Sequence, residues 1–192
     1  MKKMTDPLSL CILAACAVLN LVGGTVALLF HLPVYLDSFG TMFAAAILGP
    51  AAGMIPGLIS GLISGCTSDV YAFYYIPVQM VIGLVSGFVF LKFSPAARGH
   101  RRRLFPAAAV ICIPGTLVSS AVTAFVFGGI TSSGSTVLVQ LLHAAGLPLT
   151  ASVFLIQFFT DYLDRAIVLA AVLIVLPVFL PLWKNHCAKE RV

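Results

Sequence analysis

The chain has 192 residues, of which 60% are hydrophobic and 9% charged, and its formal net charge is +5. Soluble globular domains carry roughly 25% charged residues, and disordered chains lack the apolar residues that dominate here. The mean hydropathy of +1.10 therefore indicates a membrane protein. Its apolar runs are continuous rather than alternating, which predicts spanning helices and excludes an outer-membrane barrel. Since one span takes about 20 residues, the length also excludes a large soluble catalytic domain.

We predict an all-α polytopic membrane protein, a single domain over residues 1–192 with six transmembrane helices. The first apolar run, from Leu8, is too long for the core of a signal peptide, so we interpret it as an uncleaved span. The pair Gly49-Pro50 interrupts the next apolar stretch, which predicts two short helices joined there. The predicted spans cover about residues 8–30, 38–49, 52–66, 76–93, 104–127 and 165–183.

The segment over residues 128–164 is too long for a simple turn. It reads as a loop rich in Gly, Ser and Thr, followed by two short helices over about 137–145 and 150–162. One straight helix from Thr150 to Trp183 would be about 51 Å long, whereas the apolar core of a bilayer is about 30 Å thick. We therefore expect 150–162 to form a separate surface or partly re-entrant helix, so that this outer segment is partly helical.

The distribution of charge predicts the orientation. Basic residues gather at the two ends of the chain and after the fourth span, and with six spans these places share one side of the membrane. By the positive-inside rule that side is cytoplasmic, which predicts a multi-pass protein of the cell membrane with both termini inside. The basic residues are Lys2, Lys3, Lys92, Arg98, Arg101, Arg102, Arg103, Lys184, Lys189 and Arg191.

Small residues recur at every fourth position from Ala45 to Gly65, and Gly83 and Gly87 repeat the spacing. This pattern is typical of helices that pack closely, and we predict packing inside the bundle rather than a docking surface. The five cysteines are scattered and form no CxxC pair, and His143 has no second ligand at metal spacing. The sequence therefore predicts neither a disulfide nor a metal site.

Polar residues on the outer side are the candidates for substrate binding. Three tyrosines lie close in sequence to Asp69 and Gln79, and an aromatic belt at the membrane surface does not require so many polar residues together. Gln79 lies inside a predicted span, where an amide without a hydrogen-bond partner is costly. Four polar residues from Gln157 to Arg165 recur at spacings of three and four, so that several of them share a helix face. The candidate residues are Asn20, Asp37, Asp69, Tyr71, Tyr74, Tyr75, Gln79, Gln157, Asp161, Asp164 and Arg165.

Several of these residues also admit purely structural roles. Asn20 suits an interhelical hydrogen bond, and Arg165 beside Asp164 suits an ion pair at a helix end. Alternatively, Arg165 binds a carboxylate while a spare aspartate binds an amine, which predicts a zwitterion or a small carboxylate as the substrate. A pocket formed by the tyrosines and Phe154 would instead suit a vitamin that carries a ring.

Enzymatic motifs are absent from the sequence. It has no Walker A loop, HExxH, GxSxG or dinucleotide fingerprint. We therefore predict a protein that is not an enzyme, has no catalytic residues and no cofactor, does not bind nucleic acid and does not itself hydrolyse ATP.

The whole chain resembles the substrate-binding S-components of energy-coupling factor (ECF) transporters. The resemblance rests on Leu-Pro-Val-Tyr-Leu-Asp-Ser-Phe-Gly-Thr over 32–41, on Ala-Ala-Ala-Ile-Leu-Gly-Pro-Ala-Ala-Gly over 44–53, on the Gly-rich run ending at Cys66, and on Asp164-Arg165. It implies a subunit in the lipid bilayer that captures a vitamin or small micronutrient from outside, with the loop over 31–37 as a lid. It also implies three partners, a transmembrane coupling subunit and two cytoplasmic ATPase subunits.

Two other classes remain open. A structural or cell-shape membrane protein with the same six-helix layout would bind no small molecule and would associate with partners other than ATPases. An intramembrane enzyme would use Asp69, Asp161 or Asp164, and it requires these carboxylates to converge near the middle of the membrane.

Overall fold

The computed structural model describes residues 6–93 and 104–189, and every regular element within these ranges is helical. This confirms the all-α prediction. The elements are α1 (Pro7–Leu29), α2 (Phe39–Leu48), α3 (Pro50–Thr67), α4 (Ala72–Phe93), α5 (Leu104–Ala121), the π-helical turn η2 (Val122–Val126), α6 (Ser135–Ala144) and α7 (Leu149–Lys189).

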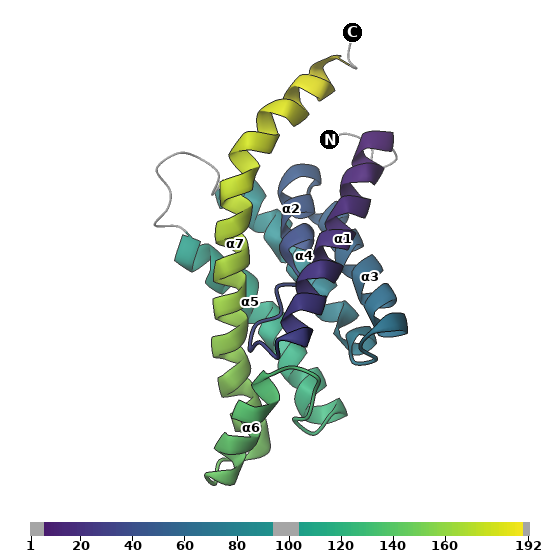
Figure 1. Ribbon diagram of the computed structural model, residues 1–192. Coiled ribbons are helices and arrows are strands. Elements are labelled where there is room, and N and C mark those ends of the chain that lie inside the picture. Colours follow the sequence, from purple (N-terminus) through teal and green to yellow (C-terminus); the bar gives the residue numbers. More distant parts are fainter. Residues whose placement is uncertain (1–5, 94–103, 190–192) are drawn as a thin grey trace.

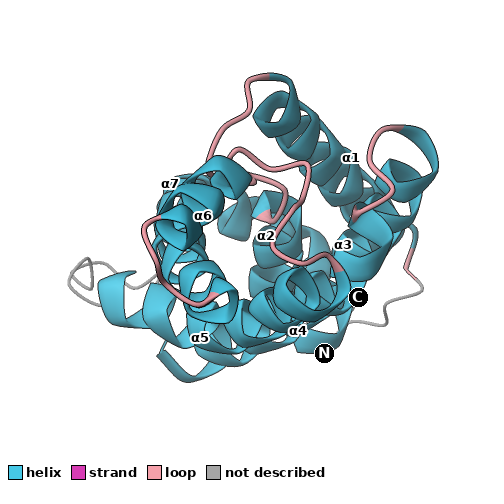
Figure 2. Ribbon diagram, turned by 90° about the horizontal axis from the view of Figure 1, so that it is seen from below, coloured by secondary structure: helices cyan, strands magenta, loops and turns pink. Residues whose placement is uncertain are grey.

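Helices α1 to α5 alternate in direction, and α7 runs back from the end at which α5 finishes (Figure 1). The start of α1 and the end of α7 lie at one end of the bundle, and α6 lies at the other (Figure 1). The loops 30–38, 68–71 and 127–134 also lie at the end that carries α6, which we call the loop end. Viewed from there, these loops cross the middle of a ring of helices (Figure 2). Of the predicted basic residues, those at positions 2, 3, 98, 101–103 and 191, and the side chains of Lys184 and Lys189, lie outside the described residues.

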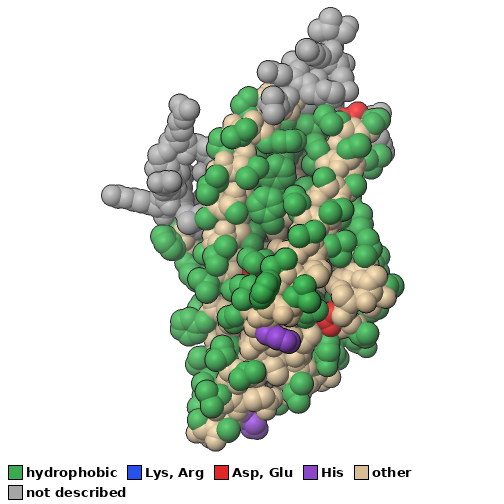
Figure 3. All heavy atoms as spheres, in the orientation of Figure 1, with side chains coloured by type: hydrophobic (Ala, Val, Ile, Leu, Met, Phe, Trp, Pro, Cys, Tyr) green, Lys and Arg blue, Asp and Glu red, His purple; other side chains and the backbone are tan. Residues whose placement is uncertain are grey.

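Five helices are long and apolar enough to cross a membrane: α1, α3, α4, α5 with its π-helical continuation, and α7. By contrast, α2 and α6 have ten residues each. Hydrophobic side chains cover much of the visible face of the bundle (Figure 3). In the interior, large side chains from four helices pack together, among them Met42, Ile82, Ile111 and Leu169. By length and composition, this architecture is compatible with a multi-pass membrane protein.

The prediction of a separate outer helix before the last span is wrong. Residues 149–189 form the single helix α7 of 41 residues, about 61 Å long. No glycine or proline interrupts the chain between Thr150 and Leu176, so nothing ends the helix there. The polar residues from Asp161 to Arg165, which suggested a helix end at the outer surface, are buried against neighbouring helices instead.

The predicted break at Gly49-Pro50 is confirmed. The helix α2 ends at Leu48, α3 begins at Pro50, and Gly49 joins them with a φ of 99°, a conformation that favours glycine. Packing of the glycine stripe inside the bundle is also confirmed, because Gly53, Gly57, Gly61 and Gly65 of α3 all lie against α4. Without side chains, the two helices approach closely.

Replacing Gly57 by leucine is expected to force α3 and α4 apart. A Cβ atom at this position would lie 2.8 Å from the Cβ atom of Gln79 and 3.1 Å from Oγ1 of Thr41. Overpacking of this kind costs about 1–3 kcal/mol, which thermal unfolding in detergent measures as a lower Tm. Cys66→Leu is the control, because Cys66 is exposed on the same helix. Equal Tm values for the two variants would contradict the close packing.

Candidate functional site

A cavity of about 110 Å³ lies at the loop end, between α1, α3, α4, α5 and α7. Residues from the loops 30–38, 68–71 and 127–134 complete its wall. The loops also contact each other, because Gly134 lies against the backbone carbonyl of His31. The space exceeds what a single water molecule needs, so it suits a small solute.

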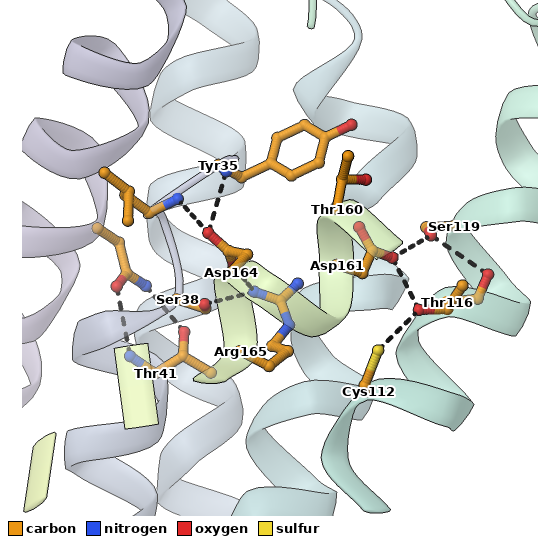
Figure 4. A network of polar contacts seen from close by, with 12 residues as sticks. Tyr35, Ser38, Thr41, Cys112, Thr116, Ser119, Thr160, Asp161, Asp164 and Arg165 are labelled. Carbon is orange, nitrogen blue, oxygen red and sulfur yellow. Dashed lines mark hydrogen bonds and ion pairs between the residues drawn. The ribbon is translucent and has the colours of Figure 1, made fainter. Parts of the chain in front are cut away.

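Asp164 of α7 fastens the loop between α1 and α2 (Figure 4). Its Oδ1 atom accepts hydrogen bonds from the backbone N–H groups of Tyr35, at 3.0 Å, and Leu36, at 2.7 Å. Its Oδ2 atom pairs with the guanidinium of Arg165, which also donates to the hydroxyl of Ser38 at 2.6 Å. A carboxylate that is completely buried therefore holds the loop, and it does not itself line the cavity.

The conformation of this loop is unusual. Both His31 and Leu36 have positive φ angles, 48° and 52°. Side chains other than glycine rarely adopt this conformation, and for a bulky residue it is strained. Because the N–H group of Leu36 is one of the two that Asp164 binds, the contact between the loop and α7 stabilises the strained backbone.

Asp161 lies one turn before Arg165 on α7, and its side chain is buried against α5. The hydroxyls of Thr116 and Ser119 donate to its Oδ2 atom at 2.9 and 3.0 Å (Figure 4). Both donors bind the same oxygen. Unlike Asp164, Asp161 lines the cavity.

The turn η2 supplies a second buried contact between α4 and α7. Oγ1 of Thr123 lies 2.5 Å from the hydroxyl of Tyr75 and accepts a hydrogen bond from the amide of Gln157 at 2.6 Å. Gln157 is only 2% exposed and does not line the cavity, whereas Tyr75 does. Gln157 thus joins α7 to η2, and the contact with Thr123 positions Tyr75 in the cavity wall.

Asn20 joins α1 to the first turn of α2. Its Oδ1 atom accepts a hydrogen bond from the N–H group of Gly40 at 2.7 Å, and its amide donates to Thr41 at 2.8 Å. The residue before α2, Ser38, makes no capping hydrogen bond with its own side chain. Asn20 therefore satisfies a backbone donor at the N-terminus of α2, a role that a capping residue normally fills.

Asp37 and Gln79 lie close to each other in the cavity wall. Oδ1 of Asp37 and Oε1 of Gln79 are buried and accept no hydrogen bond from any described residue. Burial raises the pKa of Asp37 to about 6 from its ordinary value of 3.8, although Arg165 and the Gln79 amide favour the ionised form. The negative charge of Asp164 adds to the increase.

The raised pKa of Asp37 predicts how stability depends on pH. The folded protein binds this proton more tightly than the unfolded chain, so its stability is expected to increase as the pH falls from about 7 to 4 and to level off below. The free energy of unfolding increases by about 1–3 kcal/mol over this range, after allowance for the partial exposure of Asp37. Thermal unfolding between pH 7.5 and 4.5 measures it, and Asp37→Asn should flatten the curve. Parallel curves for the two proteins would contradict the assignment.

The acidic and aromatic residues at the rim divide into two groups. Asp69 lines the cavity, caps the turn to Tyr71 with a hydrogen bond of 3.1 Å and accepts one from Ser132 at 2.5 Å, which joins two of the loops. Tyr71 and Tyr74 instead pack on Phe127, with ring centroids 4.7 and 5.0 Å away, outside the cavity.

The cavity thus brings together seven of the eleven predicted residues: Asn20, Asp37, Asp69, Tyr75, Gln79, Asp161 and Arg165. Tyr71, Tyr74, Gln157 and Asp164 do not line it, and neither does Phe154, which is 39% exposed. Sequence reasoning missed Tyr35 and the hydroxyls of Ser60, Ser119, Ser132 and Ser133. Serines are common in membrane helices and loops, so only Tyr35, within the predicted lid, offered a signal.

His143 lies away from these residues and makes a contact within its own segment, where its ring Nδ1 lies 2.8 Å from the backbone carbonyl of Leu147. Within residues 6–93 and 104–189, no three His, Cys, Asp or Glu side chains come together as metal ligands. The chemistry that the cavity offers is therefore hydrogen bonding and charge.

Comparison with protein-family models, with curated proteins and with solved structures finds no match to this chain.

Proposed function

We propose that this protein is the substrate-binding subunit of an ATP-driven importer of the ECF type, which captures a vitamin or small micronutrient outside the cell. The observation that carries the proposal is a cavity at the loop end, lined by buried polar groups and covered by fastened loops. A preorganised cavity from which loops exclude water binds a small solute tightly, because little ordering remains to be done on binding.

The proposed topology has six crossings, with both termini on the cytoplasmic side of the cell membrane and the loop end outside. In this topology α2 is the second crossing, although its ten residues extend only about 15 Å. A span shorter than the apolar core is accommodated by local thinning of the bilayer.

Energy for uptake would come from partners. The sequence carries no phosphate-binding loop, so we propose that a transmembrane coupling subunit and two cytoplasmic ATPase subunits associate with this protein. Co-purification of such subunits supports the proposal. A stable complex with other partners and no bound solute would instead favour the structural class.

The decisive experiment is to identify what the protein binds. Purified protein is denatured, the released small molecules are identified by mass spectrometry, and the hit is titrated back by calorimetry. We expect one stoichiometric solute with a dissociation constant below 1 μM, on the order of −8 kcal/mol or better. Absence of any retained or rebinding solute contradicts solute capture, and conversion of the solute during incubation favours the enzyme class.

A further inference from the structure

The charges around the cavity are strongly unbalanced. Three carboxylates line it, those of Asp37, Asp69 and Asp161, whereas Arg165 is the only cation on its wall in the described part of the chain. Arg165 is already neutralised, because it forms an ion pair with Asp164 behind the wall. The net charge of the cavity wall is therefore negative.

Arg165 is also poorly placed to receive an anion. One of its terminal nitrogens donates to both Asp164 and Ser38. The carboxylates of Asp164, Asp161 and Asp37 all act on its charge. A bound carboxylate could contact the remaining guanidinium nitrogens, but it would enter the field of the Asp161 and Asp37 carboxylates, and like charges in a poorly hydrated site repel strongly.

Two unpaired acceptors point to the kind of group that binds. Gln79 lines the cavity and is only 6% exposed, and its buried Oε1 atom has no donor among the described residues. Oδ1 of Asp37 is in the same state. A buried acceptor without a donor costs about 1–3 kcal/mol, and here a ligand with N–H groups can supply both donors. The Gln79 oxygen is evidence for a ligand that is independent of the acidic cluster, to which Asp37 belongs.

On the basis of the proposed function, we propose that the captured solute is a cation with N–H donors, such as an ammonium, an amidinium or a protonated nitrogen heterocycle. Asp161 and Asp37 balance its charge, and Gln79 accepts one of its hydrogen bonds. The rings of Tyr35 and Tyr75 also line the cavity, and aromatic faces attract cations, most strongly where water is excluded.

The test separates solutes by charge. The low-molecular-weight fraction of a vitamin-rich cell extract is passed over cation and anion exchangers at pH 7, which gives a cationic, an anionic and a neutral pool, the last including zwitterions. Each pool is added to the purified protein in detergent, the shift in Tm is measured, and retained molecules are identified by mass spectrometry. We expect stabilisation by the cationic pool alone.

Variants of the cavity residues test which carboxylate binds the cation. Asp161→Asn keeps an oxygen acceptor for Thr116 and Ser119 and is expected to weaken binding of the retained cation about tenfold or more. Asp161→Glu, which keeps the charge, should bind more tightly than Asp161→Asn. Gln79→Leu should also weaken binding. Thr67→Val is the control, because the exposed hydroxyl of Thr67 bonds only to its own helix.

The outcomes distinguish this inference from the function on which it rests. Stabilisation by the anionic or neutral pool alone overturns the cationic substrate but leaves solute capture intact. No stabilisation by any pool overturns solute capture itself. Stabilisation by cations that Asp161→Asn and Gln79→Leu leave unchanged overturns the assignment of the cation to this cavity.

Discussion

Replacing Asp164 by alanine is expected to destabilise the protein by about 3–5 kcal/mol, because the change leaves Arg165 buried without its partner. The side chain of Arg165 is only 5% exposed and that of Asp164 is completely buried. The N–H groups of Tyr35 and Leu36 would lose their common acceptor as well. Thermal unfolding measures the loss of stability.

The same variant also tests how the loop is held. Once Asp164 no longer stabilises the positive φ angle of Leu36, we expect the loop 30–38 to relax and limited proteolysis to cleave it faster. Asp69→Asn is the control, because it changes a carboxylate at the rim that is only partly buried. It should lower the free energy of unfolding by less than about 1 kcal/mol. If both variants had the same Tm and cleavage rate, Asp164 would not be the anchor.

Replacing Asn20 by leucine is also expected to have a large effect on stability, about 2–6 kcal/mol, since two buried groups lose their partners at about 1–3 kcal/mol each. These groups are the N–H of Gly40 and the hydroxyl of Thr41, which begin α2. Asn20 is 1% exposed, so water cannot replace the amide. We therefore expect a lower Tm and loss of helicity that begins in α2.

A control for this variant lies on the same helix. Thr25→Val removes an exposed hydroxyl that bonds only to the backbone of Leu21, and a change within about 0.5 kcal/mol is expected. If Asn20→Leu lowered the stability no more than Thr25→Val, α2 would not depend on a cap supplied by α1.

The sequence predicted the helices well where local chemistry decides the structure. Continuous apolar runs correctly predicted apolar helices, five of which, within the described residues, are long enough to span a membrane rather than the six expected. Gly49-Pro50 correctly predicted the break between α2 and α3. The spacing of the glycines correctly predicted which face of α3 is buried. These features follow from backbone geometry and from the period of the helix, so neighbouring residues are enough to predict them.

Prediction failed where residues distant in the sequence decide the outcome. Polar residues from Asp161 to Arg165 suggested an outer helix end, because their partners on α5 and in the first loop carry no local signal. The hydrogen bonds from Asp164 to Tyr35 and Leu36 cross 129 and 128 positions of the sequence. For the same reason, the composition of the segment 71–75 did not reveal that only Tyr75 of its three tyrosines faces the cavity.

The continuity of α7 has a mechanical consequence. Arg165 and Lys189 lie on the same helix, and the 24 residue steps from one to the other make an arm of about 36 Å. A tilt of about 2.5° at Arg165 would therefore displace the far end by about 1.6 Å, and helices at subunit interfaces shift by about 1–2 Å in allosteric transitions. A change in the hydrogen bonds between the loop 30–38 and Asp164 would thus move the opposite end of the bundle through α7.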